Sequence, residues 1–205
     1  MQILNAVFLV VVIIFSAIIH EVMHGVAADR LGDPTARYAG RLTLNPFPHI
    51  DPMGSIIVPF FLVLIGSPIL FGYAKPVPYN PYNLKPGRFS EAIVAAAGPF
   101  SNLVIALFAG VAVRTGLFAG AADAIFLVVV VNVMLCIFNL IPVPPLDGSK
   151  VLEALLPRAL QYGYANWRHS MEVNPLVGTG IVLFVIIALG GVFSALIYAI
   201  AGAIA

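Results

Sequence analysis

Four long stretches of apolar residues constrain the fold of this chain more than any other feature of its sequence. They cover Ile3–Ala28, Ala92–Val113, Ala124–Leu140 and Leu176–Ala203. A helix needs about 20 residues, at a rise of 1.5 Å each, to cross a bilayer, so each stretch approaches or exceeds the length of a span. Apolar residues make up 61% of the sequence and charged residues only 9%, against roughly 45–50% and 25% in soluble domains. We therefore predict an all-α polytopic membrane protein, with about four transmembrane helices in a single domain, residues 1–205.

The segments between these stretches are expected to lie in or near the membrane surface. Met53–Phe71 is apolar but is interrupted by two prolines and a glycine, which predicts a re-entrant or partly inserted segment. Ala39–Pro46 has the pattern of a short strand or membrane-associated hairpin. Tyr73–Arg88 is rich in proline, so it should be extended and not helical. Asp147–Pro157 is expected to form a short helix on the membrane surface.

A potential metal-binding motif ends the first apolar stretch. His20-Glu21-Val22-Met23-His24 has the HExxH pattern. On a helix, residues four apart share a face, so the two imidazoles can bind one metal ion, and Glu21 beside them can polarise a water molecule held there. Ionisable residues inside a membrane-length helix are costly and are functional by default. The motif therefore predicts a zinc site of the metalloprotease type.

A catalytic zinc site needs three protein ligands, and HExxH supplies two of them. Asp147 stands out as the third because it follows Pro142, Pro144 and Pro145, where the chain must unwind at the end of a span. Unwound backbone at membrane depth is tolerated where it is buried or lines a polar cavity. The residues alone leave other candidates open: Asp29, Asp33, His49, Asp51, Glu91, Asp123, Glu153, His169 and Glu172. His49 and Asp51 could also form a second metal or gating site, although a hydrogen-bonded turn is the simpler interpretation.

Three motifs follow one another along the chain. The first is HExxH, the second is Gly98-Pro99-Phe100-Ser101-Asn102, and the third runs from Asn139 through Pro142-Val143-Pro144-Pro145 to Leu146-Asp147-Gly148. In this order they resemble the site-2 protease family, peptidase family M50. The resemblance is to the small prokaryotic branch. Only Thr115–Asp123 separates the second and third apolar stretches, so no PDZ insertion is expected there. No CBS domain is expected after the last span.

The resemblance implies an intramembrane zinc metalloprotease domain that cuts transmembrane segments of membrane-protein substrates. It implies that His20, His24 and Asp147 bind one zinc ion and that Glu21 is the catalytic carboxylate. Asn139 would hold the backbone of the substrate, and Asn102 would line the site. The expected partners are transmembrane proteins or peptides and the lipid bilayer.

Charge and polarity bear on the alternatives. A net charge of +1 and the absence of a basic tract exclude a nucleic-acid partner. A zinc-binding transporter, or a membrane scaffold without proteolytic activity, is the main alternative function. A transporter has no need of a general base between its histidines, and it would distribute more polar residues through its spans. Glu21 therefore favours the protease.

The topology follows from the need of the three ligands to meet at one depth. The spans that end near His24 and Asp147 must run parallel, with one full crossing between them, so Met53–Phe71 should enter and leave on the same side. One face then carries nine of the ten basic residues: Arg30, Arg37, Arg41, Lys75, Lys85, Arg88, Lys150, Arg158 and Arg168. The other face carries only Arg114. The positive-inside rule then predicts a multi-pass protein of the prokaryotic plasma membrane with its active site near the cytoplasmic face.

Overall fold

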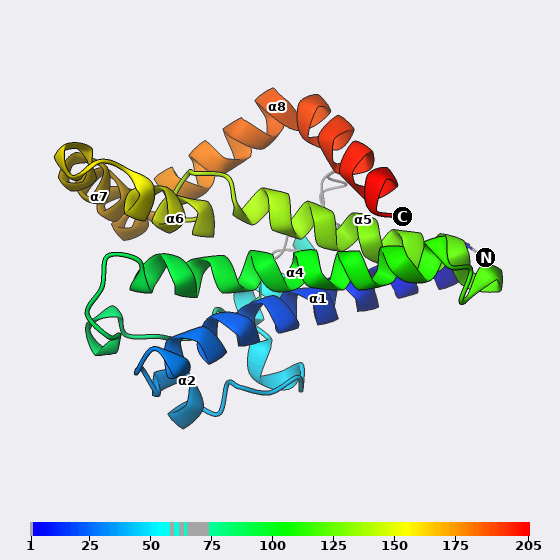
Figure 1. Ribbon diagram of the computed structural model, residues 1–205, viewed down its shortest axis with the longest axis horizontal. Helices are drawn as coiled ribbons and strands as arrows, with labels where there is room; N and C mark the ends of the chain where they lie inside the picture. Colours follow the sequence, from blue (N-terminus) through cyan, green and yellow to red (C-terminus); the bar gives the residue numbers. More distant parts are fainter. Residues whose placement is uncertain (1, 58–59, 62–63, 65–73) are drawn as a thin grey trace.

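The computed structural model describes residues 2–57, 60–61, 64 and 74–205, and this part of the chain consists of helices, turns and extended segments without a strand (Figure 1). The four long helices are α1 (Gln2–Arg30), α4 (Ser90–Arg114), α5 (Ala122–Asn139) and α8 (Pro175–Ile204). Shorter helices are α2 (Thr35–Tyr38), α6 (Asp147–Leu155) and α7 (Arg158–Val173). Single turns of 3₁₀ or π-helix lie at Phe47–His49, Pro52–Ile57, Pro81–Asn83 and Ala119–Ala121.

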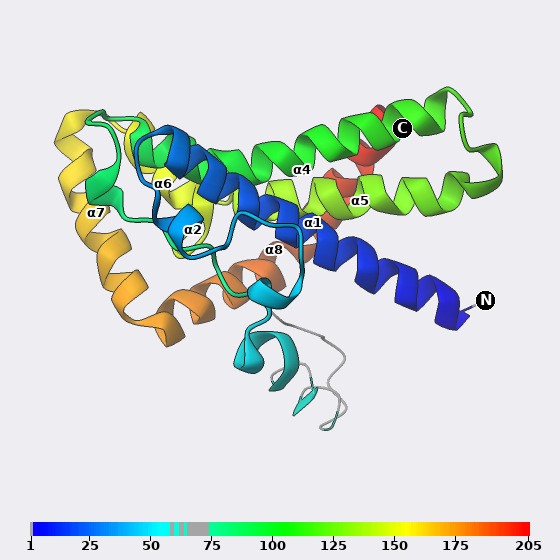
Figure 2. The same cartoon turned by 90° about the horizontal axis from the view of Figure 1, so that it is seen from below.

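The long helices form a bundle in which α4 packs between α1 and α5 (Figures 1 and 2). Each is long and apolar enough to cross a membrane, which confirms the predicted polytopic, all-α fold. Helices α1 and α5 run in the same direction and α4 runs opposite to them. The two termini lie at one end of the bundle, and α2, α6 and α7 lie at the other.

The predicted strand or hairpin at Ala39–Pro46 is wrong, because these residues form turns and bends. Their side chains bond the local backbone: the Thr43 hydroxyl accepts from the Asn45 N–H at 3.1 Å, and Asn45 Oδ1 accepts from the Phe47 N–H at 3.2 Å. Such local bonds compete with the ladder bonds of a strand. The pattern of alternating residues did not reveal this competition.

The predicted re-entrant segment, Met53–Phe71, falls largely on residues outside the described part of the chain. The residues on either side of it are described, and they meet. The Lys75 N–H donates to the His49 carbonyl at 2.9 Å, and the Arg41 guanidinium donates to the Lys75 carbonyl at 2.7 Å. His49 and Lys75, which flank the segment, therefore lie side by side.

Residues 74–80 have no helical structure, in agreement with the predicted extended segment, and a 3₁₀ turn follows at Pro81–Asn83. The fully buried Asp33 holds the end of this segment against the end of α1. Its carboxylate accepts from the Asn80 N–H at 2.6 Å, from the Asn83 amide at 2.9 Å and from the Thr35 hydroxyl at 2.5 Å. Burial alone would raise the pKa of Asp33, but these bonds hold it below the ordinary value.

Replacing Asp33 by Asn should therefore destabilise the protein by about 2 kcal/mol, because the amide places its own N–H groups against these donors. A depressed pKa contributes stability that is complete above the unfolded value of about 3.9 and is lost as the pH falls through the folded value. The unfolding temperature of the wild type in detergent should therefore decrease when the pH is lowered below about 4. The unfolding temperature of the variant should vary less with pH. The exposed Asp123→Asn provides a matched control. A variant with the midpoint and pH dependence of the wild type would contradict this role.

Candidate metal centre and catalytic site

Two helices bring three potential metal ligands together. His20 and His24 lie one turn apart near the end of α1, and Asp147 is the first residue of α6. Oδ2 of Asp147 lies 3.2 Å from Nε2 of His20 and 3.3 Å from Nε2 of His24. In the described part of the chain, this is the group of three His, Cys, Asp or Glu residues whose ligand atoms could hold a metal ion, all within 4.8 Å of one another.

In each imidazole, the hydrogen bond made by Nδ1 leaves Nε2 facing the Asp147 carboxylate. Nδ1 of His24 lies 2.7 Å from the Val94 carbonyl, which can only accept, so Nδ1 carries the proton. Nδ1 of His20 lies 2.7 Å from Oδ1 of Asn102 and donates to it in the same way. Both Nε2 atoms therefore face the carboxylate of Asp147. Donors held by zinc at about 2.0–2.1 Å in a tetrahedron lie about 3.3 Å apart, which matches the distances of 3.2 and 3.3 Å between Oδ2 of Asp147 and the two Nε2 atoms.

A buried network of amides holds Asn102 against His20. The Asn102 amide donates to Oδ1 of Asn132 at 3.0 Å and to the Ser16 carbonyl at 3.3 Å, and the Asn132 amide donates to the Ser16 hydroxyl at 3.0 Å. Asn102 and Asn132 are both completely buried. The polar atoms of Asn102 are bonded within the protein, and its contact with substrate stays a prediction. The polar residues inside apolar spans were the sequence signal for this network.

Glycines allow the helices to come close enough to form the site. A Cβ atom added to Gly98 in α4 would lie 2.5 Å from Nε2 of His24 and 2.6 Å from Nε2 of His20. A Cβ atom added to Gly148 in α6 would lie 2.2 Å from the Leu140 carbonyl oxygen at the end of α5. Both glycines belong to the sequence motifs, but their steric role could not be read from the sequence.

A cavity of about 210 Å³ opens onto the three ligands. Glu21, Asn139 and Lys150 line it, as do Val77 and Tyr79 of the extended segment. The Glu21 carboxylate accepts from the Val77 N–H at 2.8 Å. Asn139 donates to the Leu135 carbonyl at 3.0 Å and is partly exposed, so of the two predicted substrate contacts this one lies at the cavity. The contributions of Val77, Tyr79 and Lys150 were not predicted from the sequence.

Most of the other acidic and histidine candidates have partners elsewhere. His49 donates from Nε2 to the Thr43 carbonyl at 2.9 Å, and Oδ1 of Asp51 accepts from the Gly54 N–H at 2.7 Å, which favours the hydrogen-bonded turn. Asp29 pairs with Arg37. Arg168 binds three carboxylates at the end of the bundle, those of Glu91, Glu153 and Glu172.

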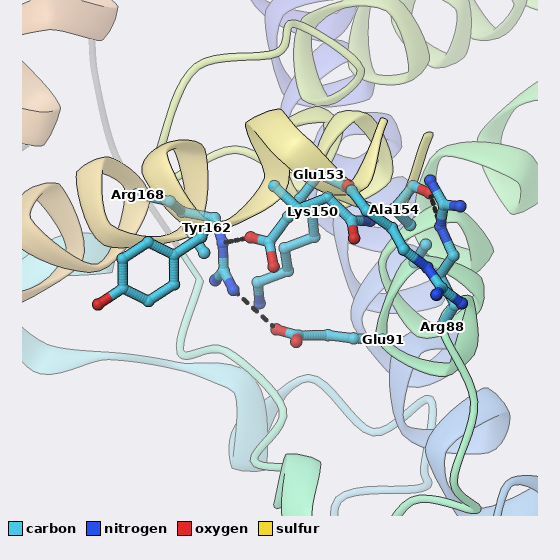
Figure 3. Close-up of a pocket in the computed structure, with 11 residues that line it drawn as sticks. Arg88, Glu91, Lys150, Glu153, Ala154, Tyr162 and Arg168 are labelled. Atoms are coloured by element: carbon cyan, nitrogen blue, oxygen red, sulfur yellow. Dashed lines mark hydrogen bonds and ion pairs between the residues drawn. The ribbon is translucent and has the colours of Figure 1, made fainter. Parts of the chain in front are cut away.

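This carboxylate cluster borders a second cavity, of about 380 Å³, between the start of α4, α6 and α7 (Figure 3). Lys150 lines both cavities and forms part of the wall between them. Burial alone would lower the pKa of Lys150, but Tyr79, Glu91 and Glu172 raise it above its ordinary value, so the ammonium group stays charged at neutral pH.

A polytopic helical bundle with a His–His–Asp cluster and an adjacent glutamate defines a metallohydrolase of the membrane. The model of peptidase family M50 matches residues 114–185. YwhC of Bacillus subtilis (strain 168), a candidate zinc metalloprotease, is 36% identical over 160 residues, which cover 73% of this chain and 69% of that protein. Rip2 of Mycobacterium tuberculosis (strain Erdman), also a candidate zinc metalloprotease, is 31% identical over 190 residues, which cover 89% of this chain and 68% of that protein.

Rip2 of Mycolicibacterium smegmatis is 33% identical over 146 residues, which cover 68% of this chain but 54% of that protein. No solved structure matches the chain. On the matched residues and their coverage, the chain belongs to peptidase family M50, a family of zinc metalloproteases.

Proposed function

We propose that the chain is a zinc-dependent intramembrane endopeptidase, which hydrolyses peptide bonds in the transmembrane segments of membrane-protein substrates. One observation carries this proposal: His20 and His24 of the membrane-spanning helix α1 converge with Asp147 at the start of α6, and Glu21 lines the same cavity. The names of the relatives support zinc as the metal. The four apolar helices support a substrate that reaches the site within the membrane.

His20, His24 and Asp147 would hold the zinc ion, which when bound polarises the peptide carbonyl and lowers the pKa of water. Glu21 accepts a proton from the attacking water and returns it to the leaving amine. The water oxygen thereby joins the carbonyl carbon, and the C–N bond breaks. Asn139, at the rim of the cavity, would bond the backbone of the bound peptide.

Metal removal tests the proposal directly. Purified protein in liposomes should cleave a labelled single-span substrate, and a chelator should stop cleavage until zinc is restored. The product termini, identified by mass spectrometry, should lie within the apolar segment of the substrate. Cleavage that continues in the chelated protein, or only outside the apolar segment, would contradict the proposal.

The substrate helix must unwind locally, because its carbonyls are otherwise bonded within the helix. Gly or Pro near the scissile bond should therefore speed cleavage, and Leu at the same positions should slow it. Equal rates across such a series would exclude unwinding as a significant barrier.

We also propose that the site faces the cytoplasm of a prokaryotic cell, in the plasma membrane. Nine of the ten basic residues belong to the segments near the site, and Arg114, which bonds the Ala203 carbonyl, lies near the termini. Cysteines at Tyr82 and Tyr162, whose side chains are 96% and 78% exposed, should be labelled from the cytoplasmic side. A cysteine at Leu117, 68% exposed, should be labelled from the opposite side. Labelling of all three from one side would refute the topology.

A further inference from the structure

The extended segment offers one backbone donor to the catalytic glutamate. Val77 lies between Pro76 and Pro78, which have no N–H group, so its own N–H is the single backbone donor of these three residues. That N–H donates to Oε2 of Glu21 at 2.8 Å. The second oxygen, Oε1, remains available for water, because a carboxylate accepts bonds at both of its oxygens.

The surface of α1 is shaped to receive Val77 at this point. Gly25 lies four residues after Glu21, so both occupy the same face of the helix. A Cβ atom added to Gly25 would lie 2.9 Å from Cγ1 of Val77 and 2.6 Å from Cδ2 of Leu42. The Val77 side chain is 5% exposed. The absence of a side chain at position 25 therefore lets the segment lie close to the helix, beside the carboxylate.

Both ends of the segment are fixed by bonds that do not involve Glu21. At one end, Lys75 is bonded to His49 and Arg41 through its backbone. At the other end, the Asn80 N–H donates to Asp33 at 2.6 Å. The segment is therefore anchored independently of the contact that it makes with the catalytic carboxylate.

Tyr79 adds a further attachment between these ends. Lys150 of α6 donates to the Tyr79 hydroxyl at 2.7 Å, and that hydroxyl donates to Glu91 of α4 at 3.3 Å. Lys150 and Glu91 both appear at the wall of the second cavity in Figure 3. The tyrosine thus links the segment to the two helices on either side of the site.

We propose that Val77 is a positioning residue, whose backbone N–H holds the Glu21 carboxylate in the orientation needed to accept a proton from water. The inference rests on the proposed function, since it assigns Glu21 the role of general base. An anchored donor fixes one carboxylate oxygen and with it the direction of the other, and such support of a reacting group is what a preorganised site requires. The prolines on either side maintain the extended backbone that presents the N–H.

Val77→Pro removes this N–H and retains a residue suited to extended backbone, and Val77→Ala removes the side chain but keeps the N–H. We expect Val77→Pro to lower kcat about tenfold or more relative to Val77→Ala, because a hydrogen bond to a charged group is lost. The KM for a single-span substrate in liposomes and the zinc content should be the same in the two variants. An equal kcat in both would overturn the proposal, and so would a higher kcat in Val77→Pro, which would mean that the N–H obstructs the base.

An amide-to-ester replacement at position 77, made with the α-hydroxy analogue of valine, removes the N–H while keeping the side chain. The ester variant should lower kcat as Val77→Pro does. If the proline variant does not fold, the ester variant alone tests the positioning role. An ester variant with the wild-type kcat would overturn the proposal. Wild-type protein and Glu21→Gln are assayed in parallel. If the wild type does not cleave, or Glu21→Gln does, the proposed function fails; if only the Val77 comparison fails, the positioning role alone is wrong.

Discussion

Replacing Glu21 by Gln is expected to abolish cleavage of a single-span substrate while leaving one zinc ion bound per chain. The amide cannot accept the proton of the attacking water, and a general base contributes about 10²- to 10⁴-fold to a rate. Its carbonyl oxygen can still accept the Val77 N–H, so the fold should be retained. Cleavage rate and zinc content, measured on the same purified preparation, check both parts.

Removing a predicted ligand should differ from Glu21→Gln in its effect on zinc binding. His20→Ala, His24→Ala and Asp147→Ala are expected to lose zinc affinity as well as activity, because each removes one of the three converging donors. Wild-type zinc affinity in Asp147→Ala would exclude Asp147 from the ligand set. Loss of zinc in Glu21→Gln would instead make Glu21 a ligand and not a base.

Gly98→Ala is expected to abolish zinc binding and activity together, although the change adds one methyl group. The new Cβ atom would lie within 2.6 Å of the Nε2 atoms of both His20 and His24, closer than any ordinary contact. Either the imidazoles turn away from Asp147 or α4 shifts away from α1, and overpacking of this kind costs about 1–3 kcal/mol or more. Zinc content and cleavage rate measure the result.

Gly190→Ala in α8 is the matched control, because nothing lies within 4 Å of an added Cβ atom there. It should bind zinc and cleave substrate as the wild type does. If Gly98→Ala also kept its zinc and its activity, zinc binding and cleavage would not depend on the close approach of α4 to the imidazoles.

The membrane-spanning helices could be predicted from the sequence because a long apolar run can form few structures other than a membrane-spanning helix. The predicted span Ala92–Val113 became Ser90–Arg114, and Leu176–Ala203 became Pro175–Ile204. Helix α7, Arg158–Val173, was not predicted, because it is amphipathic and lies across the end of the bundle instead of within it. Its pattern is that of an ordinary surface helix and gave no membrane signal.

At the site, the residues that could be predicted carry chemistry in their side chains. His20, His24 and Asp147 are brought together as expected, although their role as ligands stays a prediction. The contributions of Gly98 and Val77 could not be predicted, because one acts by lacking a side chain and the other through its backbone. Both depend on segments distant in the sequence, and a single sequence without coordinates does not show that proximity.

The separation of the ligands along the chain determines when the site can form during synthesis. Asp147 lies 127 residues after His20, on a short helix that follows the third long span. A nascent chain that has inserted α1, α4 and α5 already contains both histidines and Glu21, but it lacks the third donor. The centre is therefore complete only after residue 147 has left the ribosome and α6 has docked against the bundle. Until then the emerging chain has no assembled His–His–Asp cluster.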